Sequence, residues 1–253
     1  MTLLAPDEPG PVRVTRVSGA SDFVLTADHA GKLIPRRLGS LGVAAADLER
    51  HIAWDIGIAA VTERLSAALD AAAVLQTYSR LVIDCNRDPS WPSAMPAISE
   101  HTEIPGNVSL TAEDRAARVR EIFQPFHDQI EHLLDARAAA GQRSVLVAMH
   151  SFTPTFKGES RAMEVGVLYF RRTRLAEVML ELLRAEGDLT VGENAPYALT
   201  EDSDYSIPFH AERRGLEHVE IEIRQDLITT PEGQAAWADR LTRLLTMALP
   251  RIA

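Results

Sequence analysis

The stretch "VLVAMHSFTP", residues 145–154, is an apolar run that ends on a histidine. Val145 to Met149 suit a strand that is buried on both faces, and serine, phenylalanine, threonine and proline follow His150 at once. Open α/β sheets place their binding sites beyond the carboxyl ends of their strands. His150 is therefore either a capping or hydrogen-bonded histidine, or a metal ligand at the end of a strand.

The rest of the chain repeats this pattern of short apolar runs separated by longer amphipathic segments. We predict strands at 22–27, 72–77, 80–85, 163–170 and 218–224, and helices at about 45–69, 111–139, 173–186 and 231–248. Strands separated by helices predict one α/β domain over residues 1–253, with a mixed, mostly parallel central sheet flanked by helices on both faces. Segments 86–110 and 187–217 are expected to be irregular, and the first resembles a lid.

Composition and charge exclude several classes of protein. With 46% hydrophobic and 25% charged residues the chain is typical of soluble globular proteins, and its formal charge of -10 argues against a nucleic-acid surface. Its one cysteine, Cys85, excludes an intrachain disulfide and is expected to be buried. No run is long enough for a membrane span and the N-terminus is no signal peptide, so we expect a cytoplasmic protein without nucleic-acid or membrane partners.

Polar residues gather where four of the apolar runs end. They are the following: Asp28–His29, Asn86–Arg87, His150–Ser151 and Glu222–Arg224. An unpaired buried charge costs several kcal/mol, so such residues lie at an accessible edge or pair with one another. Singly, each has a structural explanation. The histidines could be hydrogen-bonded, Glu222 could pair with Arg224, and Arg87 could pair with a nearby aspartate.

Convergence of these ends would create a site suited to metal-assisted amide hydrolysis. Imidazoles and one carboxylate hold Zn²⁺ and leave a position for water, whose pKa the metal lowers to about 7. A second carboxylate takes the proton from this water and passes it to the leaving nitrogen. An arginine can clamp a substrate carboxylate through two hydrogen bonds.

Several longer motifs, in order, resemble the N-formylglutamate amidohydrolase family from Asp22 to Trp237. They are "DHAG" with the following "IP", "HIAWDIG", "YSRLVIDCNRDP", "IPGN", "FQPFH", "HSFTP", "VGVLY", "GENAPY" and "HVEIEIRQDL". The family is similar in turn to the zinc carboxypeptidase and aspartoacylase hydrolases, through "HS" with an aromatic, "NR" and "EIR". The resemblance implies a zinc-dependent amidohydrolase that releases formate from N-formyl-L-glutamate, a small N-acyl amino acid.

The resemblance also implies roles for individual residues. They are His29 and His150 as zinc ligands, Glu222 as catalytic base and acid, Asn86 and Arg87 as the clamp on the substrate carboxylate, Arg80 as the contact to the second carboxylate of a dicarboxylic substrate, and Tyr197 and Arg224 as further substrate contacts. The wider pattern has a glutamate ligand three residues after the first histidine, where this chain has Lys32. We therefore expect Asp55 to be the third ligand. A solvent-facing Asp55, a ligand role for His51, and Asp28 as the residue that orients His29 remain alternatives.

Two other functions stay open at this stage. The acyl group could differ, because it depends on pocket walls that the sequence does not place. Alternatively, the chain could be a catalytically silent protein that binds carboxylates. The presence of Lys32 where the wider pattern has a glutamate ligand favours this hypothesis. The oligomeric state is open.

Overall fold

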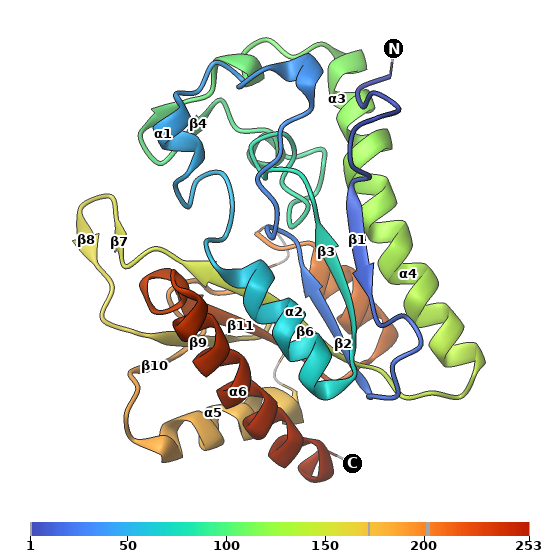
Figure 1. The fold of residues 1–253 in the computed structure, drawn as a ribbon, viewed down its shortest axis with the longest axis vertical. Coiled ribbons are helices and arrows are strands. Elements are labelled where there is room, and N and C mark those ends of the chain that lie inside the picture. Colours follow the sequence, from blue (N-terminus) through green and yellow to red (C-terminus); the bar gives the residue numbers. More distant parts are fainter. Residues whose placement is uncertain (1, 172, 201–202, 253) are drawn as a thin grey trace.

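A computed structural model describes residues 2–171, 173–200 and 203–252, and its centre is a seven-stranded sheet (Figure 1). The strands, in spatial order, are β1 (Val12–Thr15), β3 (Ala72–Gln76), β2 (Phe23–Ala27), β6 (Val145–Phe152), β11 (His218–Arg224), β9 (Val165–Leu168) and β10 (Val191–Glu193). β3, β2, β6 and β11 run parallel, β1 and β9 pair antiparallel with β3 and β11, and β10 pairs parallel with β9. The predicted mixed, mostly parallel sheet is confirmed.

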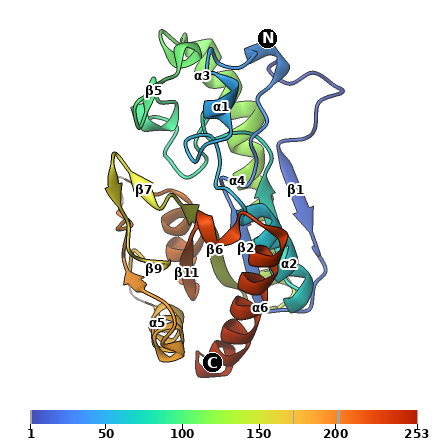
Figure 2. The same cartoon turned by 60° about the vertical axis from the view of Figure 1, so that its left-hand side comes forward.

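Helices cover both faces of this sheet (Figures 1 and 2). On one face lie α2 (Ile58–Leu69), α5 (Arg174–Glu186) and α6 (Pro231–Ala248), and on the other α4 (Gln124–Ala139), which continues from α3 (Ala112–Arg118) through a π-helical turn at Val119–Phe123. The helices predicted at 111–139, 173–186 and 231–248 are therefore present. None of the helices in the described residues combines the length and hydrophobicity that a membrane crossing requires.

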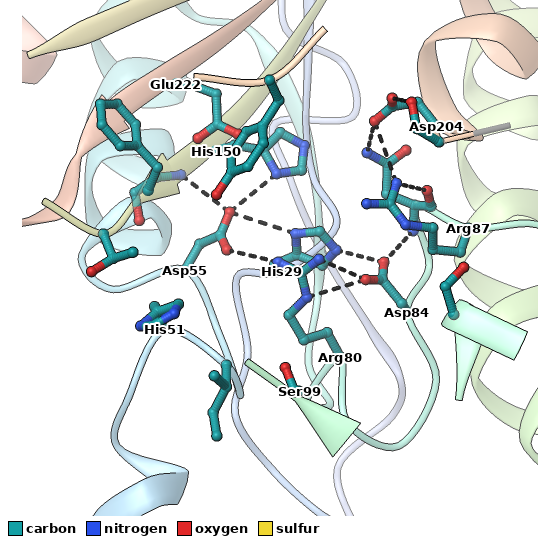
Figure 3. Close-up of a pocket in the computed structure, with 18 of the residues that line it drawn as sticks. His29, His51, Asp55, Arg80, Asp84, Arg87, Ser99, His150, Asp204 and Glu222 are labelled. Atoms are coloured by element: carbon teal, nitrogen blue, oxygen red, sulfur yellow. Dashed lines mark hydrogen bonds and ion pairs between the residues drawn. The ribbon is translucent and has the colours of Figure 1, made fainter. Parts of the chain in front are cut away.

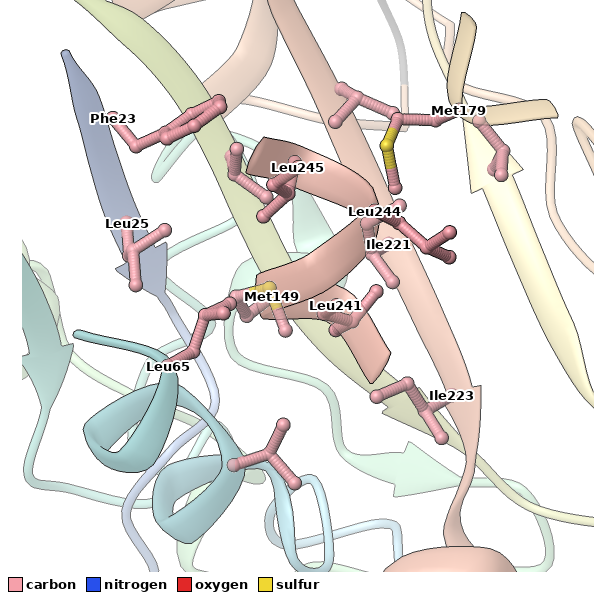
Figure 4. Packing of buried hydrophobic residues seen from close by; sticks show 14 of the residues in the cluster. Phe23, Leu25, Leu65, Met149, Met179, Ile221, Ile223, Leu241, Leu244 and Leu245 are labelled. Carbon is pink, nitrogen blue, oxygen red and sulfur yellow. The ribbon is translucent and has the colours of Figure 1, made fainter. Parts of the chain in front are cut away.

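The two faces of the sheet differ in polarity. On the first, alternate strand residues such as Leu25, Met149 and Ile221 pack against Leu65 and Leu244 of the helices in a wholly apolar core (Figure 4). The second face is apolar only near the amino ends of the strands. Because side chains alternate with a period of two, the residues that follow on this face are those of the polar strand ends. They are His150 in β6 and Glu220 and Glu222 in β11.

Two elements differ from the predictions. Residues 80–85 form no strand: they make turns, with Val82 N–H donating to Ser79 O and Arg87 N–H to Asp84 O. Leu81, Val82 and Ile83 are nevertheless buried. Their backbone carbonyls accept hydrogen bonds from side chains, since Arg118 donates to Val82 O and Asn107 to Leu81 O. The apolar run thus correctly predicts burial but not the strand. A turn can also be buried when its backbone polar groups are hydrogen-bonded.

The helix predicted at 45–69 is divided into α1 (Ala45–Leu48) and α2, with turns between them. Gly57 has φ +82° and allows the chain to enter α2 directly after Asp55. Asp55 N–H donates to His29 O at 2.9 Å, which holds this segment against the end of β2. The interruption is what turns Asp55 from a helix surface toward the sheet. β1 and β10 were not predicted.

Two hairpins stand beyond the carboxyl ends of the parallel strands and lie next to one another (Figure 2). One is β4 (Ile98–Ser99) with β5 (Thr102–Glu103), and the other is β7 (Thr155–Phe156) with β8 (Glu159–Ser160). Glu100 at the tip of the first accepts from Lys157 N–H of the second at 3.1 Å. The irregular segment 86–110 therefore contributes a wall above the end of the sheet.

Substitution of Gly57 tests the turn that delivers Asp55. A Cβ at Gly57 would lie 2.1 Å from Ile228 O, whereas one at Gly141, which also has positive φ, would meet nothing within 4 Å. We expect Gly141→Ala to lower the free energy of unfolding by about 1 kcal/mol through backbone strain alone. Gly57→Ala should cost about 1–3 kcal/mol more because of the overlap. Urea titrations of both variants measure this, and equal losses would contradict the assigned role of Gly57.

Candidate active site

Three buried side chains from separate segments meet at the carboxyl ends of the parallel strands (Figure 3). His29 follows β2, His150 lies near the end of β6, and Asp55 comes from the turns before α2. His150 Nδ1 lies 3.1 Å and His29 Nδ1 3.5 Å from Asp55 Oδ2, and one potential ligand atom of each residue lies within 4.8 Å of the others. Ser151 N–H donates to the same Asp55 oxygen. These residues form a group that could bind a metal ion.

Further carboxylates face the outer nitrogens of both imidazoles. His29 Nε2 lies 2.7 Å from Asp84 Oδ1, and His150 Nε2 lies 3.8 Å from Glu220 Oε2 and 4.0 Å from Asp28 Oδ2. Histidines that ligate metals usually donate their second N–H to a carboxylate, which fixes the ring and its tautomer. The expectation that Asp28 orients His29 is wrong. Asp84 has that position, and Asp28, which accepts from Ser206 Oγ, lies nearer His150.

Among the described residues, the site holds several buried carboxyl groups and one guanidinium in contact with them. The carboxyl groups are those of Asp28, Asp55, Asp84, Glu220 and Glu222, and the guanidinium in contact with them is that of Arg80. Burial raises the pKa of Glu222 to about 7, and burial also raises the pKa of Glu220 well above its usual range. Burial opposes protonation of His150, but the negative charges of Glu220 and Asp55 outweigh it and raise the pKa of the imidazole.

This arrangement fits a divalent cation. His29 Nδ1, which points toward Asp55, and Glu222 Oε2 are both buried and have no hydrogen-bond partner among the described residues. Two imidazole nitrogens and one carboxylate oxygen are ligands that Zn²⁺ accepts. A cation between them would also stabilise the ionised form of these buried carboxyl groups, because an unpaired buried charge costs several kcal/mol.

A cavity of about 410 Å³ opens over the group, a volume in the range of small-molecule sites. Residues on its wall include His29, Asp55, Arg80, Arg87, His150, Tyr197 and Glu222, which shows that the predicted strand ends converge. Glu222 is opposite His150 in the parallel pairing of β11 with β6. The cavity can therefore bring a small substrate to the candidate ligands and to Glu222, which lies outside their group.

Of the predicted carboxylate clamp, Arg87 and Asn86 are placed differently. Arg87 lines the cavity with about a quarter of its side chain exposed and lies 3.6 Å from Asp204. The side chain of Asn86 is held by the segment 204–206: one N–H of its amide donates to Asp204, and its oxygen accepts from Tyr205 N–H and Ser206 N–H. Asn86 also lines the cavity, so both members of the predicted clamp lie on its wall.

The structure contradicts the expectation that Arg224 contacts the substrate. Its guanidinium pairs with Asp226 at 2.8 Å and donates to the backbone carbonyls of residues 161–163. Arg224 is also absent from the cavity wall. Arg224 lies one residue beyond the last pairing of β11 with β9, which is at Ile223. Its side chain can therefore turn toward the edge of the sheet. The alternative ion pair between Glu222 and Arg224 is likewise not formed.

Other histidines of the motifs lie outside the candidate ligand group. His51 lines the cavity 3.6 Å from Glu100. His127 donates from Nε2 to Cys85 O and accepts at Nδ1 from His210 Nε2, so this buried pair is structural. Lys32 pairs with Glu49 and lies over the ring of Trp54, away from the group.

Sequence reasoning missed the importance of Asp84 and Glu220. Both are now seen to face imidazole nitrogens. A signal existed for each: Asp84 is the one charge in the apolar run "LVIDC", and Glu220 shares a strand face with Glu222. Glu100, buried beside His51 at the tip of a hairpin, carried no comparable signal because its segment lacks periodicity.

Comparison with known proteins identifies the chain. A family model described as N-formylglutamate amidohydrolase matches residues 21–229. The chain belongs to this family. The chain is similar to a solved structure of a gene product from Agrobacterium tumefaciens, with 42% identity, 99% coverage of both chains and a TM-score of 0.95. No curated protein matches the present chain.

A second solved structure is similar in fold. It is an N-formylglutamate amidohydrolase from Ralstonia eutropha, which shares 19% identity over 95% of this chain and 98% of that chain with a TM-score of 0.71. The resemblance of the motifs to the family is confirmed by the family model that matches residues 21–229.

Removal of the Asp84 charge tests its role at His29. Asp84→Asn keeps the shape but weakens the hold on His29 Nε2, so we expect the affinity for Zn²⁺ to fall about 10–100-fold. Competition with a chelating indicator measures the dissociation constant. The matched control is Asp88→Asn on the same loop, whose carboxylate accepts only from Ser90 in the described structure. Equal affinities of the two variants would contradict the role of Asp84.

Proposed function

We propose that this protein hydrolyses N-formyl-L-glutamate to formate and L-glutamate with the help of one zinc ion. The observation that carries the proposal is the meeting of His29, Asp55 and His150 in a cavity that also holds Glu222, in a chain of the N-formylglutamate amidohydrolase family. A bound zinc ion supplies Lewis acidity, which polarises a carbonyl group and acidifies water.

His29, Asp55 and His150 are the proposed ligands. Asp84 keeps His29 oriented, and Glu220 with Asp28 faces the outer nitrogen of His150. Lys32 stands where the wider pattern has a glutamate ligand, which favoured a silent binding protein. In this proposal Asp55 takes the place of that glutamate, with a carboxylate from a different segment. The ligand set is thus complete in charge and number for a hydrolytic zinc site.

Glu222 is the proposed base and acid. It lies beside the proposed ligands and outside their group, and its Oε2 is buried with no hydrogen-bond partner among the described residues. A pKa of about 7 suits a group that must both accept and return a proton near neutral pH. Glu222 accepts a proton from the attacking water. It then delivers this proton to the amide nitrogen as the C–N bond breaks, which releases formate and the free amino group.

Two arginines are proposed to hold the substrate. Arg87 offers its donors to the α-carboxylate, where a guanidinium can make two parallel hydrogen bonds. Arg80 is fixed by Asp84 at 2.7 Å and lies 3.5 Å from Asp55 Oδ1, so it is beside the candidate ligands. We propose that Arg80 contacts the oxygen of the reacting carbonyl, where negative charge develops.

The test is formate release by the purified, zinc-loaded protein. We expect turnover of N-formyl-L-glutamate, and a 10²–10⁴-fold lower kcat for Glu222→Gln, with bound zinc unchanged because Glu222 is no ligand. Glu232→Gln in the first turn of α6 is the control and should match the wild type. Zinc binding without turnover by the wild type would favour the silent carboxylate-binding protein. Faster turnover of N-acetyl or N-succinyl amino acids would instead reassign the acyl group.

The pH profile distinguishes a base from a structural carboxylate. Glu222 accepts a proton only when ionised, so kcat/KM should rise with pH through its pKa of about 7, or through a lower value when a bound cation favours the charged form. The acid limb should disappear from the residual activity of Glu222→Gln. An identical acid limb in the variant would assign the ionisation to another group.

A further inference from the structure

The cations around the cavity differ in how far their charge is already balanced. Arg80 is paired with Asp84 and Asp55, Arg87 lies near Asp204, and Arg50 is paired with Asp47 and Glu100. Arg161 and Lys157 are the exceptions at this end of the sheet, because among the described residues no carboxylate lies within ion-pair distance of either cation. Lys157 is exposed in the β7–β8 hairpin, whereas Arg161 is partly buried.

Aromatic rings hold Arg161 in place instead. Its Cζ lies 4.7 Å from the centre of the Tyr197 ring, 4.7 Å from that of Phe156 and 5.9 Å from that of Phe152. Such stacking orients a guanidinium while its edge N–H groups stay free to donate. Only one of these, on Nη1, has a side-chain acceptor among the described residues: the Tyr197 hydroxyl at 2.7 Å.

The backbone around Arg161 is also anchored. Its N–H donates to Pro154 O at 2.8 Å, and Arg224 donates to the carbonyls of residues 161–163. Arg224, which does not enter the cavity, therefore positions the segment that carries Arg161. This support favours a fixed orientation of the guanidinium over a freely moving surface side chain.

All three rings that hold Arg161 line the cavity. The Tyr197 hydroxyl lies close enough to Glu222, Arg161 and Arg80 to be affected by their charges. It accepts from Arg161, and its own proton has no acceptor among the described residues. Arg161 and Tyr197, which we call the rim pair, thus lie together at the edge of the cavity: Tyr197 lines the wall, and Arg161 donates to its hydroxyl from behind the lining residues.

We propose that the rim pair binds the side-chain carboxylate of the substrate and so selects acidic N-acyl amino acids. The inference rests on the proposed function and deepens it. A dicarboxylic substrate brings two negative groups into a site that already holds several buried carboxyl groups, so each needs a cation that can still donate hydrogen bonds to it. Arg87 serves the α-carboxylate, and Arg80 is neutralised by two aspartates. Arg161 is left for the second carboxylate, with Tyr197 as a second donor to it.

The experiment compares N-formyl-L-glutamate with N-formyl-L-glutamine, which has nearly the same shape without the charge. In zinc-loaded Arg161→Gln we expect kcat/KM for the glutamate substrate to fall about 10–100-fold, the usual loss of a charge-assisted hydrogen bond, mainly through KM. Turnover of the glutamine substrate should change less than about threefold, within the error of a surface substitution. Arg161→Lys, which keeps the charge, should restore part of the preference. Tyr197→Phe should lower it without loss of the fold.

The matched control is Arg213→Gln. Arg213 also stacks on a ring, that of Phe209 at 4.5 Å, but lines a different cavity, so the same loss of charge should leave the preference unchanged. Equal losses for both substrates in Arg161→Gln would show a merely structural role and overturn the rim pair alone. An unchanged preference in a folded Arg161→Gln would overturn it too. Absence of turnover of both substrates by the wild type would instead overturn the proposed function, and the rim pair with it.

Discussion

The carboxylate of Asp55 joins three segments that are distant in sequence. One oxygen of this group faces both imidazoles and accepts the Ser151 N–H, while the Asp55 backbone N–H donates to His29 O. The turn at Gly57 makes this approach possible. Because the imidazoles belong to neighbouring parallel strands, the sheet sets their separation, and Asp55 completes the group from outside the sheet. Every proposed chemical role depends on this meeting.

Charge balance explains the surroundings of this group. Carboxylates lie behind both imidazoles, Arg80 balances Asp84 and Asp55, and Glu222 Oε2 has no hydrogen-bond partner in the part of the chain that the structure describes. A divalent cation would stabilise the ionised carboxylates and, by the same attraction, lower the pKa of Glu222. Beyond this inner cluster, the cations at the cavity wall are those that a substrate can use. The residues proposed for the reaction, in the inner cluster, thus differ from the arginines at the cavity that are proposed to bind the substrate carboxylates.

The sequence predicted the parts of the fold that follow from periodicity. The buried strand that carries His150 and the alternation of Glu220 with Glu222 are read directly from apolar spacing, although the strand continues to Phe152 instead of ending at the histidine. The choice of Asp55 rested on a lone carboxylate in an apolar segment, although the helix expected there is interrupted. At residues 81–83 the prediction of burial was correct and the prediction of a strand was wrong. Apolar composition alone does not distinguish a strand from a buried turn.

What the sequence could not supply was the pairing of side chains across the fold. Asp84 rather than Asp28 faces His29, and Arg224 supports a backbone segment outside the cavity. Such partners depend on which turns bring segments together, and turns such as those at 79–87 follow from side-chain hydrogen bonds to backbone. The contact between Arg161 and Tyr197 likewise depends on turns. Arg161 follows the β7–β8 hairpin, and Tyr197 lies in the irregular segment 187–217.

Anomalous diffraction from crystals of the zinc-loaded protein, recorded on both sides of the zinc absorption edge, tests the central claim most directly. The account predicts one strong peak bonded to His29 Nδ1, His150 Nδ1 and an Asp55 oxygen, at the roughly 2.0–2.2 Å of zinc–nitrogen and zinc–oxygen bonds, with Glu222 outside bonding distance. A peak bonded to other residues, or none at this group in crystals shown to contain stoichiometric zinc, would contradict it.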